Sequence, residues 1–134
     1  MANALYNKGK EKLLSAGINM LTDTIKAALV KSAYSVNLAT HEFMSDLGAN
    51  VLSTNQTLAG RSVTDGVFDA SAMTWPSVTA GDTAAFVVLF KDTGNPATSP
   101  LIYYIDTITN FPTVTSGSDV TVNDNGGANK FFAL

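Results

Sequence analysis

The sequence contains three places where residues able to ligate a metal or transfer a proton stand close together. The first is NDNGGAN, residues 123–129, in which Asp, Asn and Gly are crowded as they are in calcium-binding loops. Counting back from either glycine puts Thr121 or Val122 at the first ligand position, and neither supplies a carboxylate. No glutamate follows to complete the site, because both glutamates of the chain precede it. We therefore interpret this segment as a hairpin turn in which Asn125-Gly126 adopts positive φ angles.

The second place is HEFMSD, where His41 and Glu42 are followed by Asp46. This is not the HExxH pattern of zinc enzymes, and the chain has no second histidine to complete such a site. The third place is Asp65 and Asp69, which project to the same face of a strand. Asp beside Gly more often forms a turn, and no aromatic-lined sugar cleft can be assigned to this pair. The sequence thus predicts neither a metal site nor a catalytic carboxylate pair.

Other catalytic motifs are missing from the sequence. There is no cysteine and no Gly-x-Ser-x-Gly, and the first third has neither GxGxxG nor GK[ST]. We predict that the protein is not an enzyme and uses no cofactor.

Composition limits the class of protein and its partners. With 134 residues, 46% apolar and only 14% charged, the chain is expected to be one folded domain, residues 1–134. Its polar residues are mostly Thr, Ser and Asn, which suits a surface held against a partner, although a Thr-rich β protein can also be a monomer. A net charge of −3 disfavours nucleic acid. The longest apolar run, Ala84–Phe90, is too short to span a bilayer, and the polar start is not a signal peptide. We therefore expect no nucleic-acid or membrane partner.

Charge is unevenly distributed along the chain. Residues 1–31 hold five lysines against two acids, and residues 32–134 hold three cations against nine acids. One interpretation is a basic arm, residues 1–17, that reaches an acidic neighbour such as another copy of the β-rich body, residues 18–134. The other interpretation, which we favour, is an ordinary solvated helix face.

The chain begins with helical signals and continues with strand signals. Helix formers fill Lys8–Ser15, with Leu5, Gly9, Leu13 and Ala16 on one face and Gly17 as a possible C-cap. Thr40 is placed to cap a short helix near 40–48 that ends at Gly48. The expected strands or alternatives are Ile25–Val30 (strand or short helix), Asn50–Leu58 (loop or edge strand), Arg61–Trp75 with a turn or bulge at Asp65-Gly66, Ala84–Lys91 (central), Leu101–Ile108, Val120–Asn123 and Lys130–Leu134. The predicted fold is mainly β, an antiparallel β-sandwich (jelly-roll-like) with a short N-terminal helix or arm.

Two adjacent aromatic pairs point to an interface. Neighbours on a strand face opposite ways, so one member each of Tyr103-Tyr104 and Phe131-Phe132 must face outward from a two-layer sandwich unless something covers it. With the basic N-terminal segment, this gives the predicted interface residues: Tyr6, Lys8, Lys10, Lys12, Tyr104 and Phe132.

Several phrases of the sequence resemble a family of small structural proteins of tailed bacteriophages. They are MANALYNKGKEKLLSAGINMLTDTIKAALV, LAGRSVTDGVFDA, FVVLFKDTGNPATSPLIYYIDT and NDNGGANKFFAL, in the same order over nearly the whole chain. The chain departs from the family pattern at Ile18–Leu21, where an Ile-Asp-Trp-like segment is usual, and at Gly126-Gly127, where one glycine is usual.

The resemblance implies a virion protein assembled in the host cytoplasm, and it supplies no catalytic residues. We expect it to decorate or cement the capsid by bridging subunits of the major capsid protein, with itself as a further partner in a homo-oligomer. The alternatives are a tail or baseplate adaptor or fibre-attachment protein, and a glycan- or receptor-binding module that stacks sugars on Trp75, Tyr104 or Phe132.

Overall fold

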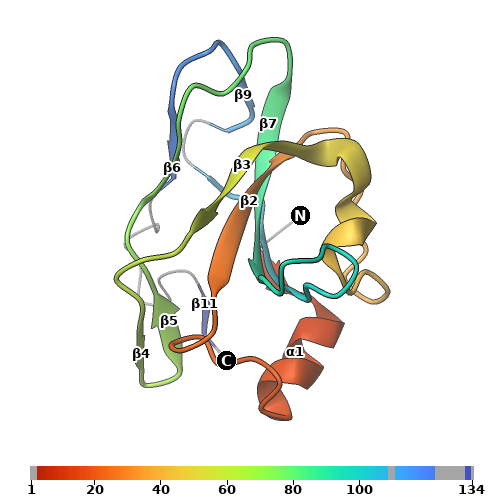
Figure 1. Ribbon diagram of the computed structural model, residues 1–134, viewed down its shortest axis with the longest axis vertical. Coiled ribbons are helices and arrows are strands. Elements are labelled where there is room, and N and C mark those ends of the chain that lie inside the picture. The colour runs from red at the N-terminus through yellow and green to blue at the C-terminus, as the bar shows by residue number, and fades with distance from the viewer. Residues whose placement is uncertain (1–2, 109–110, 123–131, 134) are drawn as a thin grey trace.

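The computed structural model describes residues 3–108, 111–122 and 132–133, and it is mainly β with antiparallel sheets and two short helical segments (Figure 1). The strands are β1 Ala4–Leu5, β2 Ile25–Lys31, β3 Val51–Thr57, β4 Ser62–Thr64, β5 Val67–Asp69, β6 Met73–Trp75, β7 Thr83–Lys91, β8 Leu101–Ile105, β9 Thr113–Val114, β10 Val120–Val122 and β11 Phe132–Ala133. The helical segments are α1 Asn7–Leu14 and the 3₁₀ segment η1 Met44–Asn50. The predicted mainly β, sandwich-like antiparallel fold is confirmed.

The main sheet is built around β7. Its strand order is β1-β8-β7-β2-β3, and β9 also pairs with β7. Leu89 of β7 lies opposite Ala27 on one side and Tyr103 on the other. The apolar run of β7 is buried on both faces, as predicted for a central strand.

The first face of the main sheet packs against two small sheets. These are β6 with β10, and β4, β5 and β11. Leu29 and Leu89 of the main sheet belong to one core with Phe68 of β5 and Trp75 of β6. Since apolar side chains from facing sheets fill this core, the arrangement is sandwich-like.

The second face is also covered, which the sequence did not predict. Val88 and Tyr104 of the main sheet pack in a second core with Tyr34, Met44 and Leu47 from the connection between β2 and β3. This connection, residues 32–50, folds back over the sheet on the right of Figure 1. Tyr103 and Tyr104 do face opposite ways, but only 7% and 3% of their surfaces are exposed. The prediction of an outward-facing Tyr104 is therefore wrong, because a further layer covers the face.

Helix α1 packs on its own chain. Gly9 lies so close to β8 that a Cβ there would be 2.7 Å from the Leu101 carbonyl oxygen. The helix ends with the Gly17 amide donating to the Lys12 carbonyl at 2.7 Å, while Ala16 takes the positive φ of 63°. The predicted helix is thus present, and it lies against the sheet instead of extending as an arm.

The remaining local predictions have mixed outcomes. Residues 25–31 are a strand, and residues 51–57 form the edge strand of the main sheet. Asp65-Gly66 is the turn between β4 and β5, with φ angles of 53° and 77°. The segment near 40–48 begins at Met44, not after Thr40, because the Asp46 carboxylate accepts the backbone N–H groups of Glu42 and Phe43.

The NDNGGAN segment lies outside the described residues. The strands on either side of it pair with different partners, since Val120 lies opposite Trp75 and Phe132 lies opposite Phe68. The two closing strands therefore belong to separate small sheets, which corrects the expectation of a hairpin formed by the two of them.

Candidate functional site

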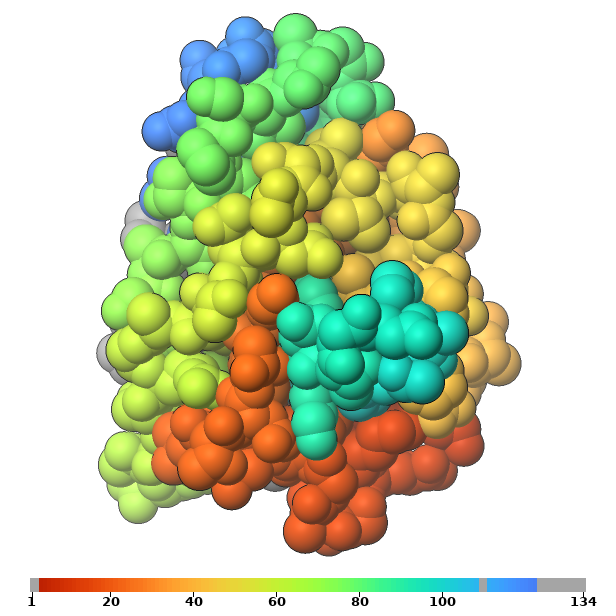
Figure 2. Space-filling model, in the orientation of Figure 1, coloured from red at the N-terminus to blue at the C-terminus, as the bar shows by residue number. Residues whose placement is uncertain are grey.

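Three elements at one end of the molecule carry exposed apolar side chains. Among the described residues, the large apolar side chains with the greatest exposure are Leu14 (82%), Val114 (71%), Val63 (48%) and Leu21 (47%). Leu14 ends α1, Leu21 lies in the connection 17–24, and Val63 lies in β4. These three elements lie side by side at the lower end of Figures 1 and 2, whereas β9, which carries Val114, is at the opposite end. We call the end that carries Leu14, Leu21 and Val63 the basal surface.

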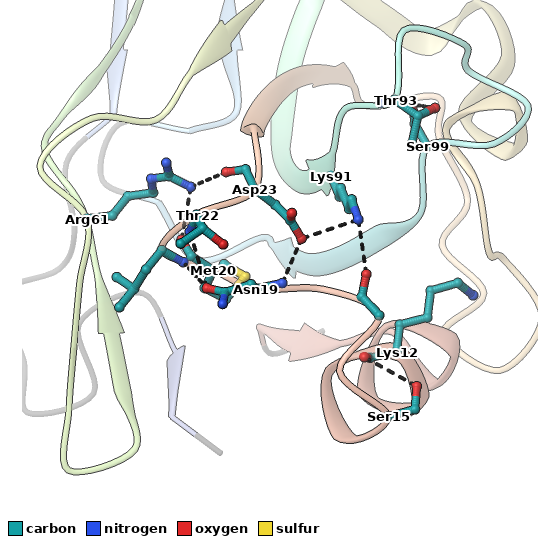
Figure 3. A network of polar contacts seen from close by, with 12 residues as sticks. Lys12, Ser15, Asn19, Met20, Thr22, Asp23, Arg61, Lys91, Thr93 and Ser99 are labelled. Carbon is teal, nitrogen blue, oxygen red and sulfur yellow. Dashed lines mark hydrogen bonds and ion pairs between the residues drawn. The ribbon is translucent and has the colours of Figure 1, made fainter.

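Hydrogen bonds join the elements of the basal surface (Figure 3). The Arg61 guanidinium, just before β4, donates to the carbonyl oxygens of Met20 (3.0 Å) and Asp23. Lys91 at the end of β7 donates to the Gly17 carbonyl at 3.1 Å and pairs with the Asp23 carboxylate at 3.3 Å. The connection 17–24 is therefore fixed from two sides, and it lies between α1 and β4 (Figure 1).

A tight turn presents Leu21 to solvent. The Asn19 side-chain oxygen accepts the backbone N–H groups of Leu21 (3.0 Å) and Thr22 (3.2 Å), and the Asn19 N–H donates to Asp23 Oδ2 at 2.7 Å. That backbone N–H is the main cause of a lowered pKa of Asp23, and Lys91 and Arg61 add to it. Asp23 is consequently charged at neutral pH, and the turn is ordered before any partner binds.

Two of the sequence-predicted interface residues are buried. Tyr6 has no exposed surface and Tyr104 has 3%, so neither ring reaches a partner in this conformation. The reason is the second core, in which both side chains pack beneath residues 32–50. Trp75 is also fully buried, which removes it, with Tyr104, as a platform for stacking sugars.

The predicted lysines lie on α1 and make different contacts. Lys12 pairs with Glu42 at 2.7 Å and lies 5.3 Å from the centre of the Phe43 ring, so it attaches α1 to the covering layer. Lys8 pairs with Glu11 within the helix at 3.3 Å, and Lys10 is exposed. Phe132 lies in β11, and its side chain is outside the described part of the structure. The six predicted residues therefore do not form one surface.

A hydrogen-bonded aromatic cluster occupies the second core. The hydroxyls of Tyr6 and Tyr34 are 2.8 Å apart, and the Tyr34 hydroxyl is 2.7 Å from His41 Nδ1. The Tyr34 ring also lies 6.4 Å from Tyr104, which in turn lies 5.2 Å from Phe86. Burial raises the pKa of Tyr6 and raises that of Tyr104 to about 12, so both phenols are neutral. No periodicity in the sequence predicts that these residues come together.

The acidic residues near His41 are engaged in structural contacts. Glu42 pairs with Lys12, and Asp46 caps η1. Within residues 3–108, 111–122 and 132–133, no group of three or more His, Cys, Asp or Glu is arranged to hold a metal ion. Across the same ranges, no helix combines the length and apolarity needed to cross a membrane.

Comparison with known proteins yields no family: no family model and no curated protein matches this sequence.

Proposed function

We propose that this chain is a non-enzymatic virion structural protein of a tailed bacteriophage. In this proposal it decorates or cements the capsid, with the basal surface docked on the major capsid protein. The observation that carries the proposal is the group of Leu14, Leu21 and Val63 on a fixed end of a β-rich body. The resemblance of the sequence to small phage structural proteins supplies the class of partner.

Energetics favour an interface centred on these side chains. Burying a leucine that is otherwise in water contributes about 1.5–3 kcal/mol. Apolar anchors surrounded by small polar groups are the usual centre of an interface, and fixing them beforehand reduces the entropy lost on binding. A standard interface buries about 800 Å² per partner, roughly an eighth of the 6548 Å² surface of this chain. The flanking polar residues of α1, the connection 17–24 and β4 must therefore take part.

Docking through side chains fits this fold better than strand addition. Among the described strands, the main sheet ends at β3 on one side and at the two-residue β1 on the other, and the pairing of β3 with β2 shifts between Ala27 and Leu29. Ser53, within the shifted part of β3, has a positive φ of 58°. Irregularity of this kind prevents a partner strand from continuing the sheet.

A sedimentation assay with expanded capsids of the phage that encodes the chain tests the proposal. The double variant Leu14→Ser, Leu21→Ser should bind at least about tenfold more weakly than the unchanged protein. Val114→Ser, a change at an exposed apolar side chain of the opposite end, is the control and should bind normally. Equal binding by all three proteins would refute docking through the basal surface.

The copy number in intact particles separates the head from the tail. A cement protein must approach the abundance of the major capsid protein, whereas an adaptor or fibre-attachment protein follows the low rotational symmetry of the tail. A count far below that of the capsid protein would exclude the cement function and favour the tail.

A further inference from the structure

Three side chains form a hydrogen-bonded chain from the second core to the surface. It begins at Tyr6, which is fully buried, passes through the Tyr34 hydroxyl at 2.8 Å, and ends at Nδ1 of the half-buried His41 at 2.7 Å. These hydrogen bonds join the start of α1 to the layer that covers the second face.

A backbone amide indicates which group donates in each of these hydrogen bonds. The Asn37 N–H donates to His41 Nδ1 at 3.4 Å, and a backbone N–H cannot act as an acceptor. Nδ1 is therefore unprotonated, and the Tyr34 hydroxyl must donate to it. The Tyr34 oxygen then accepts from the Tyr6 hydroxyl, whose one hydrogen-bond partner among the described residues is Tyr34. Each hydrogen along the chain points toward His41.

We propose that His41 is an acid-sensitive latch that holds residues 32–43 over the second face of the main sheet. Protonation places a hydrogen on Nδ1. Two donors, the Nδ1–H and the Asn37 N–H, then face each other without an acceptor between them. Tyr34 can keep its bond to the imidazolium only by accepting, so its hydrogen can no longer point to Nδ1. If the Tyr34 oxygen also continues to accept from Tyr6, the Tyr34 hydrogen has lost its acceptor; if that hydrogen turns toward Tyr6, the Tyr6 hydrogen has lost its acceptor instead. In either arrangement one hydroxyl donor in the second core is left without a partner, which is unfavourable.

The charged and titratable groups around the latch do not restore that acceptor. Asp46 of η1 is close enough to interact electrostatically with His41, but its Oδ2 already accepts the N–H groups of Glu42 and Phe43. Glu42 is paired with Lys12 of α1. Tyr104 of β8 is the remaining titratable side chain that packs against Tyr34.

Release of the latch would change the surface of the protein. Tyr34, which belongs to residues 32–43, lies in ring contact with Phe86 and Tyr104, and these two rings also contact each other. In acid, this aromatic cluster becomes accessible to solvent. The inference concerns a different part of the molecule from the basal surface and does not depend on the proposed function.

Nuclear magnetic resonance tests the latch, because the chain has a single histidine whose signals need no assignment. At about pH 8, long-range ¹H–¹⁵N spectra should show Nε2 protonated and Nδ1 bare. As the pH is lowered until the imidazole signals report protonation of His41, amide exchange at residues 34–41 should increase. After correction for the intrinsic pH effect, we expect an increase of about tenfold. A neutral form protonated on Nδ1, or unchanged exchange, would overturn the proposal.

His41→Asn is the matched control. Its side-chain oxygen can take the place of Nδ1 as an acceptor for Tyr34, but it does not titrate. Exchange at residues 34–41 should then be slow at both pH values. If the variant shows the same increase in acid as the unchanged protein, the pH dependence arises elsewhere and the latch is excluded. If the variant does not fold, the tautomer and exchange measured on the unchanged protein still decide.

Discussion

Replacing Gly9 by alanine would test how closely α1 packs on the sheet. A Cβ at this position would lie 2.7 Å from the carbonyl oxygen of Leu101 and 3.0 Å from both the Cα and the carbonyl oxygen of Ile102. All three atoms are backbone atoms of β8, which is paired with β1 on one side and β7 on the other. The strand cannot move without losing those hydrogen bonds, so α1 must move away.

Two opposing contributions set the size of the effect. Alanine favours the helix over glycine by about 1 kcal/mol. Overpacking a rigid contact costs about 1–3 kcal/mol, and the larger values apply when backbone atoms are in the way. Moving α1 also disturbs the Lys12–Glu42 ion pair at 2.7 Å. We expect Gly9→Ala to lower the free energy of unfolding by about 1–2 kcal/mol in total.

Urea unfolding followed by circular dichroism measures this difference. Lys10 is the neighbouring helix residue and is exposed, so the pair Lys10→Ala and Lys10→Gly reports helix propensity alone in the same helix. Lys10→Ala should be more stable than Lys10→Gly by about 1 kcal/mol. At position 9 the order should be reversed, with the alanine variant less stable than the unchanged protein that has glycine. If Gly9→Ala stabilises the protein as much as alanine does at position 10, the close contact with β8 is refuted.

Three further predictions concern single side chains. Ala16→Gly should raise the free energy of unfolding by about 0.5–1 kcal/mol in a thermal melt, because Ala16 holds a positive φ of 63° that glycine adopts without strain; a loss of stability would contradict this. Tyr34→Phe should cost about 1–3 kcal/mol and more than Tyr6→Phe in urea, because only the former leaves a fully buried hydroxyl without a partner; equal costs would count against the hydrogen-bond direction. The pKa of Asp46 is lowered mainly by the Glu42 N–H, so its stabilisation is present above the ordinary carboxyl range, near 3.9, and is lost as the pH falls through its lower folded value. Asp46→Asn should therefore flatten the acid limb of a stability–pH curve, and an unchanged limb would exclude this contribution.

Strands with a strong local pattern were predictable from the sequence. The run Ala84–Lys91 is apolar enough to require burial on both faces, and Leu101–Ile105 pairs with it as expected. Asp65-Gly66 supplies two residues that tolerate positive φ, and the turn forms there. In these segments, local chemistry and tertiary structure agree.

The second face of the sheet was not predictable by the same means. Residues 32–50 carry only a short helical signal near 40–48, and nothing in it indicates that Tyr34 and Leu47 are buried against the sheet. Their position follows from long-range contacts with Tyr104, which no local rule contains. Because this layer was missing from the prediction, Tyr104 was assigned to an interface. The basal surface was missed for a related reason, since Leu14 and Leu21 look like core residues until the fold shows which side chains remain outside.

The pairing of β1 with β8 has a consequence for the order of folding during synthesis. Ala4 lies opposite Tyr104, so β1 pairs with a strand that the ribosome makes about a hundred residues later. At about 5–20 residues per second, roughly 5–20 seconds pass before that partner emerges. Meanwhile α1 has no β8 to pack on, and a helix of this length is barely stable alone in water. The segment of β1 and α1 therefore joins the fold late, and β1 then adds to β8 as an outer strand of the main sheet.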